Sequence, residues 1–327
     1  MRAMVLERPR ERLIERNLPV PDPGPGELLV RVEACGVCRT DLHVIDGDLP
    51  FPGHPVVPGH EIVGRVSALG AGGDGALVGR RVGVPWLAST CGRCAFCLSG
   101  AENLCDDAEF TGYTRAGGYA EFVCVDARFA FPLPEARDAI ALAPLLCAGL
   151  IGYRAYRMVG DATRLGLYGF GAAAHILVQI AAWQGRRVFA FTRPGDEAGQ
   201  ARARALGAEW SGDSTERPPE LLDAAILFAP VGSLVPAALS CVRKAGTVVC
   251  AGIHMTEIPA FPYALLWGER TVRSVANLTR RDGLEFLALA GACPLRTLVE
   301  SYPLSDANTA IDSVRHGTVQ GAAAVVP

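Results

Sequence analysis

Residues 165–175 read Leu-Gly-Leu-Tyr-Gly-Phe-Gly-Ala-Ala-Ala-His, an apolar run that passes through two glycines into an alanine-rich segment. This order of residues predicts a buried strand, a tight turn and the first turns of a helix. The turn is a G-x-G-x-x-A variant of the dinucleotide-binding fingerprint, in which the glycines let the backbone approach a pyrophosphate at the helix N-terminus. Similar turns occur in methyltransferases and flavoproteins, so the turn alone is a weak signal. The residues expected to contact a dinucleotide are Gly169, Phe170, Gly171, Ala172 and Ala173.

The chain beyond residue 144 alternates between apolar runs and alanine-rich segments. The runs have the length of buried strands and lie at residues 164–168, 187–192, 223–229, 246–252 and 271–276. Alternation of this kind predicts parallel strands joined by helices that cover both faces of one sheet. The expected class is α/β with a doubly wound parallel sheet. The last part of the chain contains one predicted helical stretch, at residues 281–290.

The first part of the chain has a different pattern. Short valine-rich runs at residues 27–33, 61–68 and 80–85 are separated by glycine and proline clusters, without a sustained helical period. This pattern predicts an all-β lobe. Because 327 residues exceed what a single hydrophobic core usually organises, we expect two domains.

Composition and charge exclude several classes of partner. The net charge of −3 is small and evenly spread, so neither nucleic acid nor an anionic membrane surface is expected as a partner. Residues 1–16 lack the apolar core of a secretion signal. The most apolar stretch, residues 224–242, is interrupted by prolines and glycine and is too broken for a bilayer span. A cytoplasmic location is therefore expected.

Four of the 11 cysteines form a C-x2-C-x2-C-x7-C run at Cys91, Cys94, Cys97 and Cys105. In a reducing compartment, clustered cysteines are better interpreted as metal ligands than as disulfides. Four thiolates on a loop suit a closed tetrahedral zinc site that has a structural role. An iron–sulfur cluster is the competing interpretation, although ferredoxin runs of this type carry a proline after the last cysteine. Free thiols without a metal are the third interpretation.

A second group of residues is less diagnostic by itself. It comprises Cys35-Gly-Val-Cys38-Arg-Thr-Asp-Leu-His43, Pro58-Gly-His60-Glu61 and the isolated Cys147. A single histidine is more often a hydrogen-bonded structural residue than a ligand, and a single cysteine is more often a small buried apolar residue.

Together, in this order, these motifs resemble the zinc-containing medium-chain alcohol dehydrogenases over nearly the whole chain. The resemblance implies that Cys38, His60 and Cys147 bind a catalytic zinc ion and that the four-cysteine run binds a structural one, with Cys35 outside both. A Cys2His set leaves the fourth coordination position open for substrate, on which the metal acts as a Lewis acid. It also implies a GroES-like catalytic domain at residues 1–148, a Rossmann domain at 149–277 and a return to the catalytic domain at 278–327.

The resemblance also assigns roles around the metal. Asp41 would accept a hydrogen bond from the liganding histidine, and Glu61 would lie behind the metal. Thr40 and His43 match a proton relay, which alcohol oxidation needs in a site closed to water. Without the resemblance, Asp41 would be an acid at a helix start and His43 an ordinary exposed histidine.

Further residues are expected at the cofactor. The resemblance places Arg39 at the pyrophosphate and the segments containing Gly252, Ile253, Ala276 and Leu278 beside the nicotinamide. NAD-specific enzymes carry an acid at the end of the second strand, where this chain has Thr192 and Arg193. A hydroxyl followed by a guanidinium suits a 2′-phosphate, so NADP(H) is expected to be preferred over NAD(H). The alternative is an NAD enzyme that lacks the acid and leaves Arg193 in solvent.

The expected substrate is a small primary alcohol or aldehyde, aromatic or allylic, in a pocket lined by Trp86 and Leu87. The other class considered is a zinc-stabilised quinone reductase-like or non-catalytic relative of the same fold. That class would have no chemical reason to retain Cys38, His60 and Cys147 together. A homodimer or homotetramer is expected from the resemblance.

Overall fold

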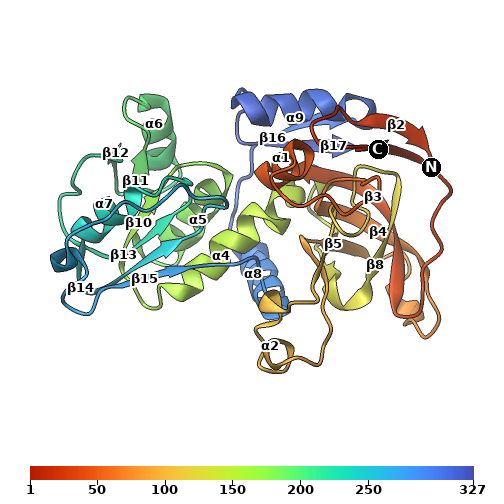
Figure 1. Ribbon diagram of the computed structural model, residues 1–327, viewed down its shortest axis with the longest axis horizontal. Coiled ribbons are helices and arrows are strands. Elements are labelled where there is room, and N and C mark those ends of the chain that lie inside the picture. The colour runs from red at the N-terminus through yellow and green to blue at the C-terminus, as the bar shows by residue number, and fades with distance from the viewer. The chain divides into compact units, whose positions relative to one another are not determined.

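The computed structural model describes residues 1–327, which form two compact units (Figure 1). The β-rich unit comprises Met1–Leu150, Asn277–Gly291 and Arg296–Pro327. The parallel-sheet unit comprises Ile151–Ala276 and Ala292–Leu295.

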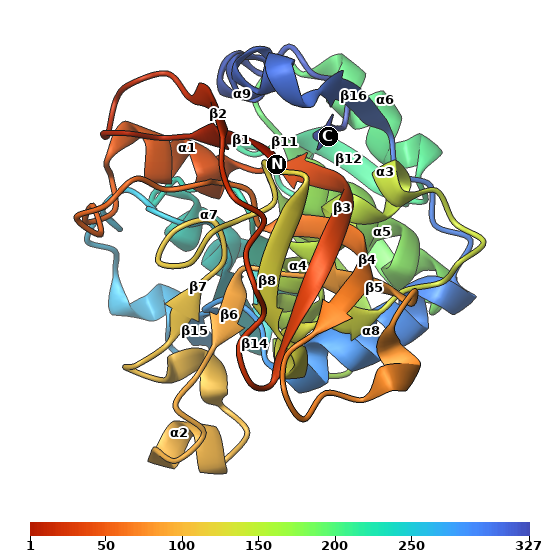
Figure 2. The same ribbon diagram turned by 90° about the vertical axis from the view of Figure 1, so that its right-hand side faces the viewer.

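The β-rich unit is built on a seven-stranded sheet in the order β16-β17-β3-β4-β5-β9, with β8 also paired to β3. Figure 2 shows β8, β3, β4 and β5 side by side. The strands of this unit are β1 (Arg2–Val5), β2 (Ile14–Asn17), β3 (Glu27–Val37), β4 (Glu61–Leu69), β5 (Arg81–Val84), β6 (Leu87–Ser89), β7 (Glu109–Phe110), β8 (Phe122–Asp126), β9 (Phe131–Pro132), β16 (Val299–Pro303) and β17 (Ala322–Val326).

The antiparallel pairing of β3 with β4 decides which functional residues meet. Gly36, near the end of β3, is opposite Glu61, the first residue of β4. Cys38 therefore leaves the sheet next to the point where His60 enters it. Residues that are distant in sequence are brought together here by strand register.

The β-rich unit also contains helices, which corrects the expectation of an all-β lobe. Helix α1 (Arg39–Asp46) ends at Gly47, whose left-handed φ of 75° forms its C-cap. Eight residues are too short to produce a clear helical period in a sequence. The other short helices are η1 (Gly75–Leu77), α2 (Ala95–Leu98), η2 (Glu102–Leu104), η3 (Ala127–Phe129), α3 (Ala139–Leu142), η4 (Ala143–Leu146) and η6 (Leu304–Asp306).

The C-terminal part holds two helices, α8 (Arg280–Ala292) and α9 (Ala307–His316), whereas only the first was expected. Helix α9 buries Ala307, Ala310 and Ile311, which share one face at i, i+3 and i+4 spacing. Two of these three residues are alanines, so the apolar stripe is weak in sequence. Strand β17 then pairs with β3, which anchors the end of the chain in the β-rich sheet.

The parallel-sheet unit has six strands, all parallel, in the order β12-β11-β10-β13-β14-β15. Numbered from β10, this is the 3-2-1-4-5-6 order of the doubly wound dinucleotide-binding fold. The elements are α4 (Ala148–Met158), β10 (Arg164–Tyr168), α5 (Ala172–Trp183), β11 (Arg187–Thr192), α6 (Glu197–Ala205), β12 (Trp210–Asp213), β13 (Leu222–Leu227), α7 (Leu234–Cys241), β14 (Val242–Cys250), η5 (Tyr263–Leu265) and β15 (Thr271–Ser274).

Side chains alternate between the two faces of this sheet. Leu167 packs in a core cluster with α4, α5 and α6, and the next residue, Tyr168, packs in a second cluster with α7. Both faces are thus covered by helices, as the uniformly apolar strands predict. The predicted fold class, a β-rich GroES-like part with a doubly wound parallel sheet, is confirmed.

None of the individual helices combines the length and the apolar character that a membrane span requires. One bent pair, Ala139–Leu146 with Ala148–Met158, meets the criteria of length and composition only.

Candidate functional site

The β-rich unit brings together Cys38, His60, Glu61 and Cys147, whose potential ligand atoms all lie within 4.8 Å of one another. The two sulfur atoms are 3.5 Å apart, although the residues are 109 positions apart in sequence. Cys38 is the N-cap of α1, His60 and Glu61 are at the start of β4, and Cys147 lies between η4 and α4. We call this group the mixed centre.

His60 is fully buried, and its two ring nitrogens have different surroundings. Nδ1 lies 2.9 Å from Asp41 Oδ1, whereas Nε2 is buried without a hydrogen-bond partner. A buried polar atom left unsatisfied costs about 1–3 kcal/mol, so native proteins rarely leave one. Nε2 has two sulfurs and a carboxylate close by, and a metal ion at their centre would satisfy it. The donor set therefore fits zinc, which prefers nitrogen and sulfur ligands.

Asp41 holds the imidazole in place. Its fully buried carboxylate accepts hydrogen bonds from the backbone N–H of Cys38 (2.9 Å) and Gly59 (3.3 Å), from His60 Nδ1, and from the Tyr119 hydroxyl (3.1 Å). The bond to Nδ1 fixes the tautomer in which Nε2 carries the lone pair. Sequence reasoning predicted Asp41 in this position but missed Tyr119.

The titratable groups of the mixed centre shift one another's pKa values. A hydrogen bond from Cys147, followed by His60, lowers the pKa of the Cys38 thiol well below its usual value. The same hydrogen bond and burial raise the pKa of Cys147. Burial opposes protonation of His60, but Asp41 and then Cys38 raise its pKa well above normal. Burial and Cys38 also raise the pKa of Glu61. Acidic groups are thus concentrated around the buried His60.

Glu61 reaches the mixed centre over a glycine. A Cβ placed on Gly36 would lie 1.8 Å from Glu61 Oε2, so only glycine leaves room for this carboxylate. Glu61 is buried, and its carboxylate lies close to the two cysteine sulfurs and to the His60 ring.

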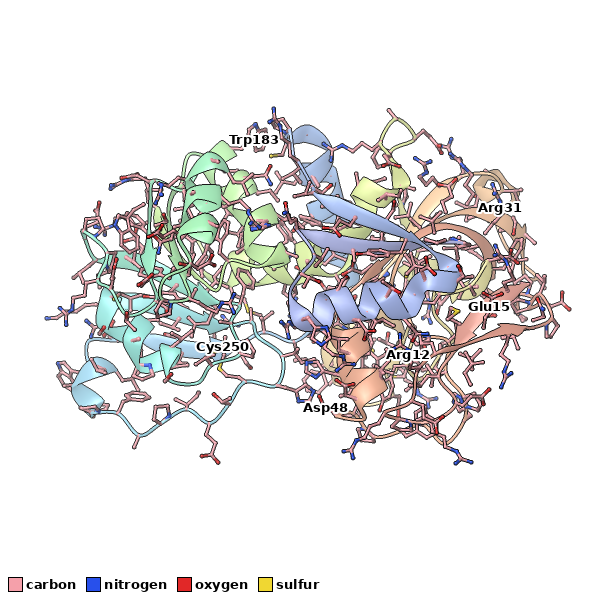
Figure 3. The ribbon with its side chains drawn as sticks, turned by 90° about the horizontal axis from the view of Figure 1, so that it is seen from above. Arg12, Glu15, Arg31, Asp48, Trp183 and Cys250 are labelled. Atoms are coloured by element: carbon pink, nitrogen blue, oxygen red, sulfur yellow. The ribbon has the colours of Figure 1, made fainter.

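The expected relay residues lie on α1. Thr40 Oγ1 is 3.8 Å from Cys38 Sγ, next to the mixed centre. His43 is three residues further along the same helix face, and its Nδ1 lies 2.7 Å from Oδ2 of Asp48, which is labelled in Figure 3. Asp48 was not predicted, because it follows the end of the helix. Arg39, the first residue of α1, is exposed.

Trp86 lies against the mixed centre. Its ring meets the His60 ring edge to face, with centroids 5.0 Å apart and an interplanar angle of 79°. The Trp86 ring also stacks on Phe110 at 5.2 Å and Tyr113 at 6.0 Å, both missed by sequence reasoning. Trp86 is half-buried, whereas Leu87 has no exposed surface. Leu87 therefore supports this aromatic group from within the core and presents no surface to a ligand.

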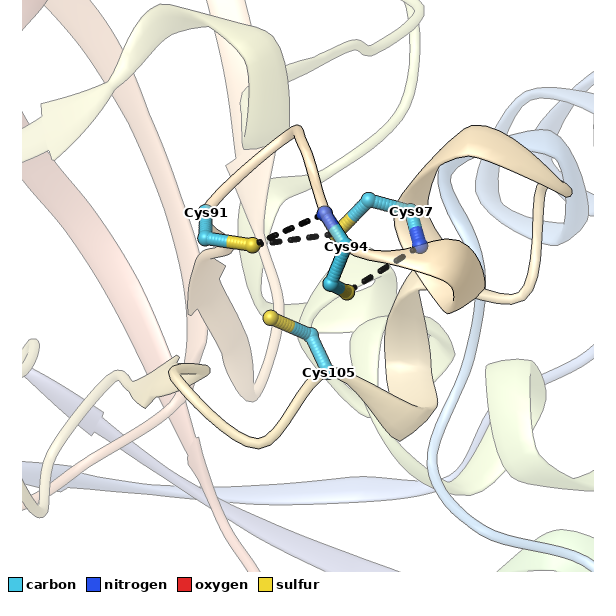
Figure 4. Close-up of side chains that lie close together, drawn as sticks. All are labelled: Cys91, Cys94, Cys97 and Cys105. Carbon is cyan, nitrogen blue, oxygen red and sulfur yellow. Dashed lines mark hydrogen bonds between the residues drawn. The ribbon is translucent and has the colours of Figure 1, made fainter.

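The four cysteines 91, 94, 97 and 105 converge in a loop that contains α2 and η2 (Figure 4). Cys91 Sγ is 3.9 Å from Cys97 Sγ, and the backbone N–H groups of Cys94 and Cys97 donate to Cys91 Sγ and Cys94 Sγ. Backbone N–H groups of Arg93 and Cys94 lower the pKa of Cys91 to about 6. Four sulfurs gathered in one loop, with the Cys91 thiolate favoured by backbone N–H groups, fit a tetrahedral metal site.

The parallel-sheet unit forms the glycine turn as predicted. Gly169 has a left-handed φ of 87°, and a Cβ there would lie 2.7 Å from the backbone nitrogen of Ala229. Gly171 is the N-cap of α5, with open space where its Cβ would be. The turn follows β10 where the strand order reverses between β10 and β13, which is where doubly wound sheets bind ligands. The ring of Phe170 lies 4.8 Å from that of His175.

At the end of β11 the two expected cofactor residues differ. The Thr192 side chain is only 2% exposed, and its hydroxyl lies 3.2 Å from the Arg193 carbonyl and accepts from Gln200 Nε2. Arg193 is exposed. Only Arg193 therefore has a side chain accessible to a cofactor phosphate.

The remaining expected cofactor residues do not form one group within a unit. Gly252 follows β14, and a Cβ there would lie 2.9 Å from Pro230 Cα. Ile253 and Ala276 are exposed, also in the parallel-sheet unit. Leu278 is buried and belongs to the β-rich unit, as does Arg39.

Comparison with known proteins finds alcohol dehydrogenases by sequence and by structure. Residues 24–135 match the family described as alcohol dehydrogenase GroES-like domain. The chain is 47% identical over 330 residues to the Mycobacterium tuberculosis protein named "Probable alcohol dehydrogenase AdhA", covering 97% of this chain and 93% of the relative. Among solved structures, a cinnamyl alcohol dehydrogenase from Sorghum bicolor has a TM-score of 0.89 at 27% identity and covers 99% of this chain and 97% of its own. A Sinorhizobium meliloti dehydrogenase described as zinc-binding, solved with NADP, has a TM-score of 0.86 at 27% identity, with coverages of 100% and 99%.

Proposed function

Because the chain belongs to the zinc-dependent medium-chain alcohol dehydrogenase family and is an NAD(P)-dependent alcohol dehydrogenase, we propose that its reacting centre is the mixed centre. Cys38, His60 and Cys147 would hold the catalytic zinc ion. The observation that carries this proposal is His60 Nε2, a buried ring nitrogen without a partner that lies with two sulfurs inside a 4.8 Å group.

Zn²⁺ held by these three residues would supply Lewis acidity, which makes an alcohol hydroxyl easier to deprotonate. Asp41 keeps the lone pair of His60 on Nε2 by accepting from Nδ1. Glu61 lies at the same point as an additional carboxylate that is able to approach the ligand set during exchange. Trp86 and its stacked neighbours provide an apolar wall on one side of the centre.

We propose that the released proton leaves along α1, where Thr40 and His43 share one helix face. We assign Thr40, beside Cys38, as the hydroxyl that accepts the proton from the substrate and passes it on to His43. Asp48 accepts from His43 Nδ1, which leaves Nε2 of that ring as the nitrogen that takes up the proton. His43 is partly exposed, so the proton is able to leave to solvent there.

The four-cysteine loop is proposed to hold a second zinc ion with a structural role. Its four sulfurs leave no coordination position for substrate. Metal analysis of the purified protein tests both sites together: we expect two zinc ions per chain. One zinc ion per chain, or iron, would contradict the assignment.

The cofactor is proposed to bind the parallel-sheet unit at Gly169–Gly171 and Arg193, with NADP(H) preferred over NAD(H). Gly252, Ile253, Ala276, Leu278 and Arg39 are assigned to it from family membership. On this basis residues 1–148 and 278–327 are the catalytic domain, and residues 149–277 are the dinucleotide-binding domain. The exposed guanidinium of Arg193, with no acid beside it in sequence, supports NADP(H).

The substrate is proposed to be a small primary alcohol or aldehyde, aromatic or allylic. The stack of Phe110, Trp86 and Tyr113 next to His60 supports this class, because aromatic rings pack favourably against flat apolar groups. The sorghum protein is a cinnamyl alcohol dehydrogenase, which agrees with a flat substrate. Comparing kcat/KM for benzylic, allylic and branched secondary alcohols tests this assignment.

We also propose a homodimer or homotetramer. Strand β15 is an edge of the parallel sheet, and the nearby Tyr263 and Trp267 are 67% and 64% exposed. Large exposed aromatic side chains beside an unpaired strand edge favour association. A cytoplasmic location is supported by the 11 cysteines, none of which forms a disulfide. Light scattering in solution measures the assembly.

A further inference from the structure

Tyr119 is a buried residue that contacts the support of the mixed centre. Its side chain has 0% exposure, and its hydroxyl donates to Asp41 Oδ2 at 3.1 Å. No sequence motif used above includes it. The phenol reaches from the segment before β8 to a carboxylate on α1, 78 positions away in sequence.

The backbone around Tyr119 is paired to the segment that delivers His60. Gly117 N donates to the Val57 carbonyl at 2.7 Å, Gly118 N to the Gly59 carbonyl at 2.9 Å, and Tyr119 N to the Pro58 carbonyl at 3.0 Å. Three successive bonds fix residues 117–119 against residues 57–59. The position of the Tyr119 ring is therefore coupled to the residue immediately before the metal-site histidine.

Glycines make this close approach possible. A Cβ on Gly59, whose φ is 96°, would lie 2.5 Å from Tyr119 Cδ1. A Cβ on Gly117 would lie 2.2 Å from the Gly59 carbonyl oxygen, and one on Gly118 would lie 2.5 Å from Ile62 Cγ1. Without side chains at these positions the ring lies directly on the turn before His60, where it has little freedom to move.

The hydrogen bonds of Asp41 are divided equally between its oxygens. Oδ1 accepts from His60 Nδ1 and Gly59 N, and Oδ2 accepts from Cys38 N and the Tyr119 hydroxyl. Two of the donors are backbone groups that cannot follow the carboxylate if it rotates. Tyr119 supplies the second donor to Oδ2, so it restrains rotation of the carboxylate plane and keeps one oxygen aimed at His60 Nδ1. Burial, followed by Asp41, raises the pKa of Tyr119 well above normal, so the phenol keeps the proton that it donates.

We propose that Tyr119 is a positioning residue of the mixed centre: its hydroxyl orients Asp41, and Asp41 in turn orients His60 toward the metal. This inference depends on the proposed function, because it assumes that the mixed centre binds zinc. Partners of this kind, outside the ligand set, change metal affinity or activity by 10–100-fold when they are removed. Tyr119 acts through one intermediate residue, so an effect of about tenfold is expected.

The test is Tyr119→Phe, which keeps the ring and its packing and removes only the hydroxyl. The matched control is Tyr156→Phe in the parallel-sheet unit, which also removes a buried phenol hydrogen bond, from Tyr156 to Gln184 Oε1 at 2.6 Å. Zinc release is followed after adding a chelator, and the absorption spectrum is recorded after Co²⁺ replaces zinc. The spectrum reports ligand geometry, which a purely structural role would leave unchanged.

We expect Tyr119→Phe to release one of two zinc ions about tenfold faster than wild type and to alter the Co²⁺ spectrum. The control should match wild type in both readouts. If folded Tyr119→Phe also matches wild type, the proposal is wrong. If wild-type protein itself holds only one zinc ion, the proposed function fails instead, so the two failures are distinguishable.

A double-mutant comparison provides a second measurement. If Tyr119 acts through Asp41, Tyr119→Phe should change zinc release little in an Asp41→Asn background, where the oriented carboxylate is already lost. Equal effects of Tyr119→Phe in both backgrounds would mean that the phenol does not act through Asp41, which contradicts the proposal.

Discussion

The four-cysteine loop and the mixed centre both gather thiols, but they depend on different parts of the molecule. The loop draws all its sulfurs from residues 91–105, and its own backbone N–H groups donate to two of them. The mixed centre collects Cys38, His60 and Cys147 from three separate segments of one unit, around a buried His60 that Asp41 holds. A site of the first kind is local and able to form early, whereas a site of the second kind needs the complete fold of the unit. The structural role therefore suits the loop, and the reacting role suits the mixed centre.

The largest expected effect comes from Cys38→Ser, which removes one sulfur from the mixed centre and leaves the loop intact. We expect the zinc content to fall from two ions to one and kcat/KM to fall about a thousandfold, since a catalytic metal contributes about 4 kcal/mol or more. Metal analysis and steady-state kinetics measure these changes. Cys35→Ala is the matched control, because Cys35 is a buried thiol outside both metal groups. Full turnover in folded Cys38→Ser would remove the distinction between the two sites.

Cys97→Ser removes one sulfur from the four-cysteine loop and leaves the mixed centre intact. This change should also remove one zinc ion, but its main effect should be on stability, because closed zinc sites contribute directly to folding. Loss of a metal site of this kind costs roughly 4 kcal/mol, which corresponds to a decrease in Tm of about 5–10 °C. Turnover measured well below the transition should stay close to that of wild type. A selective loss of turnover with unchanged Tm would contradict the structural role.

Sequence patterns predicted the local features well. Strands β10 and β11 have the predicted bounds, and the four-cysteine loop closes as its spacing indicates. The misses depend on contacts between distant segments: Tyr119 reaches Asp41 only because residues 117–119 pair with residues 57–59. Thr192 was predicted as a phosphate contact from its place at a strand end, but its hydroxyl is engaged by the carbonyl of the next residue, Arg193, and by Gly212 and Gln200, which only the fold brings there.

A second histidine shows that an unsatisfied buried ring nitrogen indicates a metal site only where other ligands surround it. His175, like His60, has a buried Nε2 without a hydrogen-bond partner, but it belongs to neither of the two groups of potential metal ligands. Burial, followed by the charge of Arg202, lowers the pKa of His175 to about 4. Because the folded pKa lies below the unfolded value of about 6.5, the stability is complete above pH 6.5 and is lost as the pH falls toward 4. The loss should be about 3 kcal/mol, because 1 pKa unit corresponds to about 1.4 kcal/mol. His175→Gln should flatten this part of a plot of unfolding free energy against pH. An unchanged slope in the variant would show that His175 is not the titrating group.

The smallest expected effect concerns the choice between NADPH and NADH, which depends on the residues at the end of β11. Arg193 is exposed at the end of β11, and the adjacent Thr192 hydroxyl is already engaged, so the guanidinium would have to recognise a 2′-phosphate largely by itself. One charge-assisted contact of this kind contributes about 1.5–3 kcal/mol when fully formed, and less at an exposed position. We therefore expect wild type to prefer NADPH, and Arg193→Ala to lower the ratio of kcat/KM for NADPH to that for NADH about tenfold. Arg217→Ala, which removes another exposed arginine of the same unit, should leave the ratio unchanged. A wild-type preference for NADH would mean that the end of β11 has neither the acid that binds the NAD ribose nor a site for the NADP 2′-phosphate. The preference for one cofactor would then come from residues outside this loop.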